Sequence, residues 1–357
     1  MLVDCIENIF NTGFTLQMKE TIHKLNLTNL PTPLEPADSL AKYLGLSSLL
    51  IKRDDMTGLA GGGNKARKLE FELADAVSGG YDTLITIGGQ QSNHARMTAA
   101  AARKLGMDVK LVLGGEDFTE LKGNMLLNAM LGAEMRYIDG SDEDDDLIAL
   151  MNMWMKELDS EGKKVYQLPI GGSTPLGSLG YFYAMKEISD QTGTPNLQII
   201  LPVGSCGTFA GSLLGAKVFM PEARVTGISI SRKKENILER TMSLIRGSAE
   251  LLGIDNPVSA EDLIILDNYH KAYAEPVKEA EEAIRTAAQL EGLILDYIYT
   301  GKVMAALFDL TARGHFDKNI PVLFLHTGGL PIVFSGKQKI PAGNICKKYS
   351  LSDIQRS

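Results

Sequence analysis

The chain has 357 residues, of which 44% are hydrophobic and 22% are charged. These are ordinary values for a globular protein with a substantial core, and the length predicts about two domains. The 36 Lys and Arg residues against 44 Asp and Glu residues give a formal net charge of −8. Non-specific binding to nucleic acid needs clustered cations, so a nucleic-acid partner is not expected for so acidic a chain.

The N-terminal segment and the cysteines indicate where the protein works. Asp4 and Glu7 stand where a secretory signal carries cations, and no long apolar core follows them. No stretch approaches the roughly 20 apolar residues that span a bilayer. Cys5, Cys206 and Cys346 are too scattered for a disulfide framework or a zinc site. We therefore expect a cytoplasmic protein with no membrane association and no metal.

Short apolar runs alternate along the chain with longer segments of helical periodicity. Strands are predicted at 49–52, 83–87, 109–113, 135–138, 165–168, 199–203, 225–230 and 322–325. Helices are predicted at 66–77, 94–105, 121–130, 146–158, 177–189, 207–219, 234–252, 276–290 and 303–312. This alternation predicts an α/β fold, with parallel sheets covered by helices.

The one strong run of charge is Asp142–Asp146. Acidic side chains complement the dipole in the first turn of a helix. The run is therefore predicted to be a solvated start of the helix at 146–158.

Ligands of parallel α/β folds bind beyond the carboxyl ends of the strands, so the turns that follow strands are informative. After strand 49–52, Gly61–Gly63 lead to Asn64 and Lys65 at the start of a helix. The helix dipole disfavours a cation there, and a Schiff base would neutralise Lys65 and supply covalent catalysis. A basic first turn without a chemical role explains the same residues, since Arg67 and Lys68 are also cationic.

The turn after strand 83–87 reads Gly88-Gly-Gln-Gln-Ser-Asn-His94. It places a hydroxyl, amides and an imidazole at the start of a helix, which suits a carboxylate or phenolate ligand. Simple N-capping by Ser92 or Asn93 is the alternative interpretation.

The turn after strand 199–203 reads Val203-Gly-Ser-Cys-Gly-Thr-Phe-Ala-Gly211. The backbone N–H groups of Gly204–Thr208 could bind a phosphate at the helix N-terminus. The GxGxxG fingerprint of dinucleotide-binding folds is absent from this turn. Cys206 has no base beside it in the sequence, so we expect it to be passive.

Two segments near the C-terminus also carry chemistry. Leu295-Asp-Tyr-Ile-Tyr-Thr-Gly-Lys302 contains Tyr299, a candidate acid or base, and Leu325-His-Thr-Gly-Gly329 places Thr327 after a buried strand. Each segment taken alone is more often structural.

Together these segments resemble the fold-type II pyridoxal-phosphate enzymes, in particular the family of D-cysteine desulfhydrases and 1-aminocyclopropane-1-carboxylate (ACC) deaminases. The resemblance runs from about Pro31 to Pro331 and is most specific in Ile51-Lys-Arg-Asp-Asp55, Gly62–Glu70 and Gln91–His94. It implies pyridoxal 5'-phosphate as cofactor, a small amino-acid substrate and a homodimer.

The resemblance also implies a two-lobed fold like that of the tryptophan synthase β chain. A large cofactor-binding domain would comprise residues 1–66 and 171–357, and a small α/β domain, residues 67–170, would be inserted into it. The cofactor would lie between the two lobes.

Site roles follow from the resemblance residue by residue. Lys65 would hold the cofactor, Asn93 would bond its phenolic oxygen and Thr327 would face its pyridine nitrogen. The cofactor phosphate would be bound by Lys68 and by the backbone of Gly204, Ser205, Cys206, Gly207 and Thr208. The substrate would be bound by Ser92, Asn93, His94, Tyr273 and Tyr299. Lys65, Tyr299 and Ser92 would be the catalytic residues.

Two positions bear on the substrate. ACC deaminases of this family typically read Tyr-Glu-Gly-Lys and His-Leu-Gly-Gly in the C-terminal segments, where this chain has Thr300 and Thr327. A neutral hydroxyl at the pyridine nitrogen makes the cofactor a weaker electron sink than a carboxylate does, which suits elimination of a good leaving group. We therefore expect α,β-elimination of D-cysteine to pyruvate, sulfide and ammonia.

The alternatives within the family are ACC deamination, L-cysteate sulfo-lyase activity and the lysis of another β-substituted amino acid. Outside the enzymes, the alternative is a ligand-binding sensor on the same scaffold. The chain also departs from the family pattern at Cys206, where glycine is typical.

Overall fold

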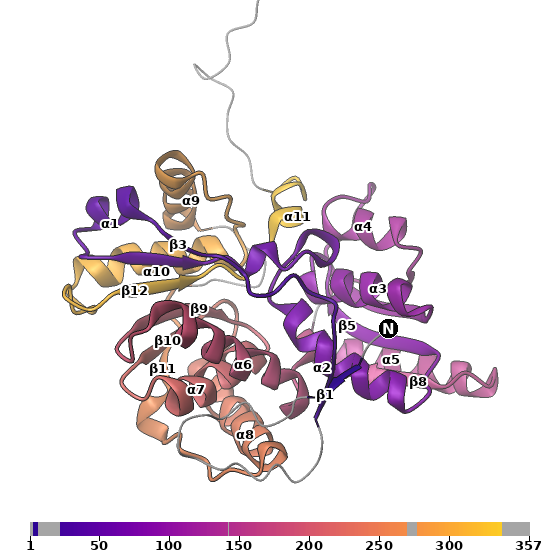
Figure 1. The fold of residues 1–357 in the computed structure, drawn as a ribbon. Coiled ribbons are helices and arrows are strands. Elements are labelled where there is room, and N and C mark those ends of the chain that lie inside the picture. The colour runs from indigo at the N-terminus through magenta and orange to yellow at the C-terminus, as the bar shows by residue number, and fades with distance from the viewer. Residues whose placement is uncertain (1–2, 6–21, 142, 270–276, 338–357) are drawn as a thin grey trace, which may run out of the picture.

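The computed structural model describes residues 3–5, 22–141, 143–269 and 277–337. Within these ranges the strands form a six-stranded sheet, a four-stranded sheet and a two-stranded antiparallel ribbon of β1 (Val3–Cys5) and β2 (His23–Leu25). Helices pack around both larger sheets (Figure 1). The predicted α/β class is confirmed.

The six-stranded sheet has the order β11-β10-β9-β12-β4-β3. Its strands are β3 (Leu34–Pro36), β4 (Leu49–Lys52), β9 (Gln198–Val203), β10 (Arg224–Ser229), β11 (Ile264–Leu266) and β12 (Val322–Leu325). All neighbouring pairs are parallel except β3 with β4, which is antiparallel. The predicted parallel sheet is confirmed, and the antiparallel pair involves only β3, an edge strand that was not predicted. A three-residue strand that ends in Pro36 is tolerated at this edge because an edge strand needs fewer ladder bonds.

The four-stranded sheet has the order β7-β6-β5-β8, with all neighbours parallel. Its strands are β5 (Thr83–Gly89), β6 (Asp108–Gly115), β7 (Glu134–Asp139) and β8 (Val165–Leu168). Every residue of β5 is buried, as expected for a central strand with helices on both faces.

All nine predicted helices are present, with ends that shift by a few residues. The helices are α1 (Asp38–Leu44), α2 (Lys65–Ser78), α3 (Asn93–Leu105), α4 (Asn124–Met130), α5 (Asp144–Ser160), α6 (Pro175–Thr192), α7 (Gly207–Phe219), α8 (Lys234–Leu252), α9 (Lys278–Glu291), α10 (Thr300–Ala312) and α11 (Leu330–Val333). Helices α1 and α11 and strands β1, β2, β3 and β11 were not predicted. No helix in the described ranges has the length and apolar character needed to cross a membrane.

The two sheets form separate bodies, with α2 between them (Figure 1). Helix α2 packs against α6 on one side and against α3 on the other. The four-stranded sheet lies within residues 83–168, inside the predicted small domain, while the exact domain boundaries stay a prediction. This arrangement places the start of α2 where the carboxyl ends of β5, β9 and β12 approach one another.

Candidate active site

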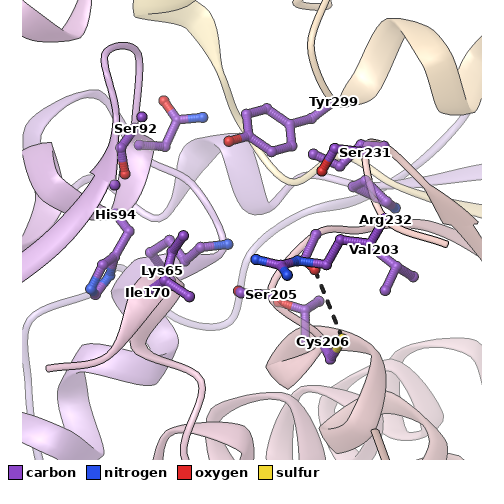
Figure 2. A pocket seen from close by; sticks show the side chains of 18 of the residues that line it. Lys65, Ser92, His94, Ile170, Val203, Ser205, Cys206, Ser231, Arg232 and Tyr299 are labelled. Carbon is purple, nitrogen blue, oxygen red and sulfur yellow. Dashed lines mark hydrogen bonds between the residues drawn. The ribbon is translucent and has the colours of Figure 1, made fainter. Parts of the chain in front are cut away.

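A cavity of about 570 Å³ lies at the meeting point of the two sheets (Figure 2). Most of the residues predicted for the site line it: Lys65, Ser92, Asn93, His94, Gly204, Ser205, Cys206, Thr208, Tyr299 and Thr327. Lys68 and Gly207 lie behind the lining residues, and Tyr273 lies outside the described residues. Turns that are remote in the sequence are thus gathered around one cavity.

Lys65 is the first residue of α2, and the preceding loop is fixed by backbone contacts. The N–H of Asn64 donates to the carbonyl of Thr327 at 3.0 Å, and Asn64 Nδ2 donates to Thr208 Oγ1 at 2.9 Å. Gly63 has φ +131°, and a Cβ there would lie 3.1 Å from the carbonyl oxygen of Thr327, so glycine permits this approach. The loop therefore holds two remote turns, those of Thr208 and Thr327, at the base of Lys65.

The amine of Lys65 is held in a setting that disfavours its charge. Burial lowers the pKa of Lys65 to about 8, and Nζ lies 3.3 Å from Asn64 Oδ1. A lysine with this pKa has a useful neutral fraction near neutral pH, as a nucleophile or base requires.

The turn before α7 forms a candidate phosphate cradle. Its N–H groups lie at the N-terminus of a 13-residue helix, where the dipole favours an anion. Cys206 has φ +74°, a left-handed conformation that glycine adopts without strain, which explains the glycine of the family pattern. Burial raises the pKa of the Cys206 thiol, which agrees with the passive role expected from the sequence.

Lys68 reaches this cradle through Ser173, which the sequence reasoning missed. Lys68 Nζ donates to Ser173 Oγ at 2.8 Å and to the carbonyl of Gly171 at 2.6 Å. Ser173 Oγ also accepts from the N–H of Gly207 at 3.2 Å and donates to Ser205 Oγ at 2.8 Å. Lys68 thus places its amine behind the cradle, and its direct contact with a phosphate stays a prediction. Burial lowers its pKa strongly, and the nearby charge of Lys65 adds to this effect.

Ser92 and Asn93 lie at the start of α3. Ser92 Oγ accepts from the N–H of Ala95 at 3.2 Å, so the N-cap interpretation is confirmed, and the same side chain lines the cavity. Asn93 Oδ1 accepts from Arg96 Nη1 at 3.2 Å and from Asn124 Nδ2 at 2.9 Å. Because Oδ1 of Asn93 is already hydrogen-bonded within the protein, the amide offers its Nδ2 as a donor to the cavity.

Arg96 is a buried cation that the sequence reasoning missed. Its Nη2 donates to the carbonyl of Gly62 at 2.7 Å, and among the described residues it forms no carboxylate pair. Burial lowers its pKa to about 10, so it stays charged at neutral pH. Arg96 therefore ties the loop before Lys65 to the amide of Asn93.

His94 points away from Tyr299 in Figure 2. Its Nε2 lies 3.0 Å from Thr86 Oγ1, and burial lowers its pKa well below the usual range, so the imidazole is neutral. Its predicted contact with substrate stays a prediction.

Tyr299 projects into the cavity from the start of α10, toward the side that carries Ser92 (Figure 2). Asp296 holds this turn, because its Oδ1 accepts from the N–H of Tyr299 at 2.8 Å. Thr300 is fully buried and its Oγ1 donates to Asp296 Oδ2 at 2.8 Å. Thr300 is therefore directed into the protein, while Thr327 lines the cavity.

The acidic run before α5 lies at the edge of the cavity. Asp144 and Asp145 begin α5, two residues before the predicted start, so the acidic run lies in the first turn of the helix as predicted. However, Glu143, Asp144 and Asp145 also line the cavity, and Asp144 Oδ2 lies 2.6 Å from Arg232 Nη2. The prediction of a purely solvated run is therefore incomplete, and it missed Arg232. We call Glu143, Asp144, Asp145 and Arg232 the rim.

The segment 51–55, singled out in the sequence, supplies a second group of charges beneath α2. Arg67 pairs with Asp54 and with Glu187, at 2.8 Å in each case, and Lys52 pairs with Glu187. Arg67 and Lys52 hold the pKa of Asp54 and of Glu187 below their usual values, although burial alone would raise them. We call Lys52, Asp54, Arg67 and Glu187 the inner charge cluster.

The residues at the cavity fit one cofactor. An amine with a lowered pKa, an anion site at a helix N-terminus and an amide donor are the groups that bind the aldehyde, the phosphate and the phenolic oxygen of pyridoxal phosphate. The chain belongs to the family of pyridoxal-phosphate dependent enzymes, whose family model matches residues 25–328. Pyridoxal phosphate is therefore the cofactor, and the fold is that of fold-type II.

Individual relatives agree with this assignment. A protein of Pyrococcus abyssi (strain GE5 / Orsay), provisionally named 1-aminocyclopropane-1-carboxylate deaminase, is 42% identical over 314 residues, which are 87% of this chain and 93% of that protein. A crystal structure described as an ACC deaminase homologue has a TM-score of 0.81 at 39% identity and covers 87% of this chain and 93% of its own. The processed form of threonine deaminase isoform 2 from Solanum lycopersicum has a TM-score of 0.60 at 16% identity, covers 92% of this chain and 82% of its own, and shows the fold alone.

Proposed function

We propose that the protein catalyses the α,β-elimination of D-cysteine to pyruvate, hydrogen sulfide and ammonia. The observation that carries this proposal is the position of Thr300. The family pattern of ACC deaminases has glutamate there, whereas here Thr300 is bonded to Asp296 and does not line the cavity. Ring opening of ACC lacks a good leaving group and would need that acid, whereas a thiol leaves without it.

The overall reaction balances with water as the only other reactant. The Cα–H and Cβ–S bonds break, and the thiolate takes a proton to leave as hydrogen sulfide. The enamine that remains takes up water to give pyruvate and ammonia. The bound cofactor withdraws the electron pair left at Cα when its proton departs.

The residues of the chain then have separate tasks. The amine of Lys65, with its pKa of about 8, accepts the Cα proton once it is free. The hydroxyl of Tyr299 protonates the leaving sulfur. Ser92 keeps its hydroxyl proton to donate to the substrate carboxylate, since its oxygen accepts the capping bond from Ala95.

ACC deamination is the second candidate, and the names of the relatives support it. L-Cysteate lysis and a non-catalytic sensor are further alternatives to the proposal. Retention of Lys65, Ser92 and Tyr299 around one cavity favours an enzyme over a sensor. Cytoplasmic location and a homodimer belong to the same proposal; the location rests on the scattered cysteines, and the homodimer rests on the family resemblance.

The test compares substrates on the purified, cofactor-loaded enzyme. D-Cysteine, L-cysteine, L-cysteate and ACC are supplied separately, and sulfide, sulfite, pyruvate, 2-oxobutanoate and ammonia are measured. We expect sulfide and pyruvate in equal amounts from D-cysteine. Release of 2-oxobutanoate from ACC without sulfide from D-cysteine would replace this proposal with the second candidate.

Lys65→Ala tests the central residue. We expect it to lower kcat by about 10³-fold or more, because both attachment of the cofactor and proton transfer lose their amine. Lys104→Ala, at an exposed position in the last turn of α3, is the matched control and should keep the wild-type rate. Equal sulfide production by wild type and Lys65→Ala would refute the assignment.

A further inference from the structure

The rim carries an ion pair that joins the two halves of the cavity. Asp144 belongs to α5, which packs on the four-stranded sheet, and Arg232 follows β10 of the six-stranded sheet. Nη2 and Oδ2 lie 2.6 Å apart, and the two side chains are 27% and 28% exposed. In Figure 2 the guanidinium of Arg232 extends into the cavity, toward the side that holds Lys65.

This pair changes what Arg232 can bind. A free guanidinium that points into an amino-acid site would attract a carboxylate, sulfonate or phosphate on the ligand side chain. Here Asp144 already occupies that position on Arg232, and Glu143 and Asp145 add two further carboxylates to the lining. The formal charge of the rim is therefore three negative groups against one positive group.

A ligand with an anionic side chain meets two costs at this rim. It must displace Asp144 from Arg232 and also approach the remaining carboxylates. A ligand with a small neutral side chain meets neither cost. Repulsion of this kind discriminates between ligands even where it adds nothing to the affinity of the preferred one.

We propose that the Asp144–Arg232 pair is a specificity determinant that rejects amino acids with anionic side chains. The substrate class is then an amino acid with a small, neutral β-substituent, a thiol rather than a sulfonate. This inference rests on the proposed function, because it takes the cavity to be the amino-acid site, and it deepens that function by separating cysteine from cysteate.

The test uses aspartate and asparagine, which have nearly the same shape and differ in side-chain charge. Neither carries a good leaving group on Cβ, so binding is measured without elimination, as the change in cofactor absorbance of the loaded enzyme during titration. Both enantiomers are titrated, and the one that binds more tightly is used. We expect the wild type to bind asparagine at least tenfold more tightly than aspartate.

Asp144→Asn should free Arg232 and tighten aspartate binding about tenfold, with asparagine binding within a factor of two of the wild type. Asp146→Asn is the matched control, because it makes the same charge change in the same helical turn and Asp146 does not line the cavity. It should leave both affinities within a factor of two. Arg232→Gln removes the only cation of the rim and should widen the preference for asparagine.

An Asp144→Asn enzyme that keeps the wild-type ratio of the two affinities would overturn the inference, as would a wild type that binds both ligands equally. The proposed function fails separately, by the absence of sulfide from D-cysteine. The two failures are therefore distinguishable, since these ligands report on binding alone. In the same variants, the ratio of kcat/KM for cysteine to that for cysteate should change in the same direction as the ratio of asparagine affinity to aspartate affinity.

Discussion

The inner charge cluster and the rim place similar side chains in different surroundings. The inner cluster, beneath α2, pairs two cations with two carboxylates, and both Arg67 and Asp54 are almost completely shielded from solvent. The rim sets three carboxylates against one cation at the open side of the cavity. A buried ion must be compensated by an opposite charge, as in the inner cluster, or by hydrogen bonds, as at Arg96, because an uncompensated one costs several kcal/mol. Solvent tolerates an excess of charge, which can then select ligands.

The largest effect is expected from breaking the inner cluster. Arg67→Met leaves Asp54 and Glu187 without their bidentate partner, and we expect a loss of about 3–5 kcal/mol in the free energy of unfolding. Urea denaturation of the cofactor-free protein measures it. The matched variant at the rim, Arg232→Met, should cost less than about 1 kcal/mol. Equal losses in the two variants would show that burial does not distinguish the regions.

Lys65 shares α2 with Arg67 of the inner cluster and lines the same cavity as the rim, and its charge depends on pH. Burial lowers its pKa from 10.5 to about 8, so roughly 10% of the amine is neutral at pH 7, against well under 1% for an ordinary lysine. The rate of cofactor attachment to the cofactor-free protein should therefore rise about tenfold per pH unit below 8 and level off above it.

Absorbance after mixing with pyridoxal phosphate measures this rate between pH 6.5 and 9.5. Nα-Acetyl-lysine, under the same conditions, is the control with an ordinary amine. A protein rate that climbs in parallel with the control beyond pH 9 would contradict the lowered pKa.

The smallest effect is expected at an exposed pair outside both regions. Lys186 and Asp190 form an i,i+4 pair on α6 at 2.7 Å, and the Asp190 side chain is largely exposed. Lys186→Met should change the free energy of unfolding by less than about 0.5 kcal/mol. Urea denaturation measures this change, which is the baseline for the losses expected in Arg67→Met and Arg232→Met. A loss above about 1.5 kcal/mol would show that solvent exposure does not explain the difference in stability between the inner cluster and the rim.

The long elements of the fold could be predicted because local sequence alone determines their pattern. Strand β5 is apolar on both faces, and α8 is an amphipathic helix of 19 residues whose predicted bounds are correct. By contrast, β3 and β11 have three residues each, too few for a periodic signal. Such short strands form because a neighbouring strand offers backbone partners, and the sequence does not show that neighbour.

The site could be predicted where a turn follows a strand, as for Lys65 and Ser92. Arg232 was missed because it lies in a turn without glycine, and Arg96 because it lies inside a helix. Their importance comes from partners far along the chain, Asp144 and the carbonyl of Gly62. Only the folded structure brings these partners together.

The hydrogen bond from Asn64 to the carbonyl of Thr327 has a consequence for biosynthesis. A ribosome makes the chain from its N-terminus, so the lysine loop emerges early and its anchoring carbonyl only near the end. Strand β12, which lies between β9 and β4 in the sheet, is also made last. A nascent chain therefore carries Lys65 in an unfinished setting during most of translation, and the complete cavity forms only as synthesis finishes.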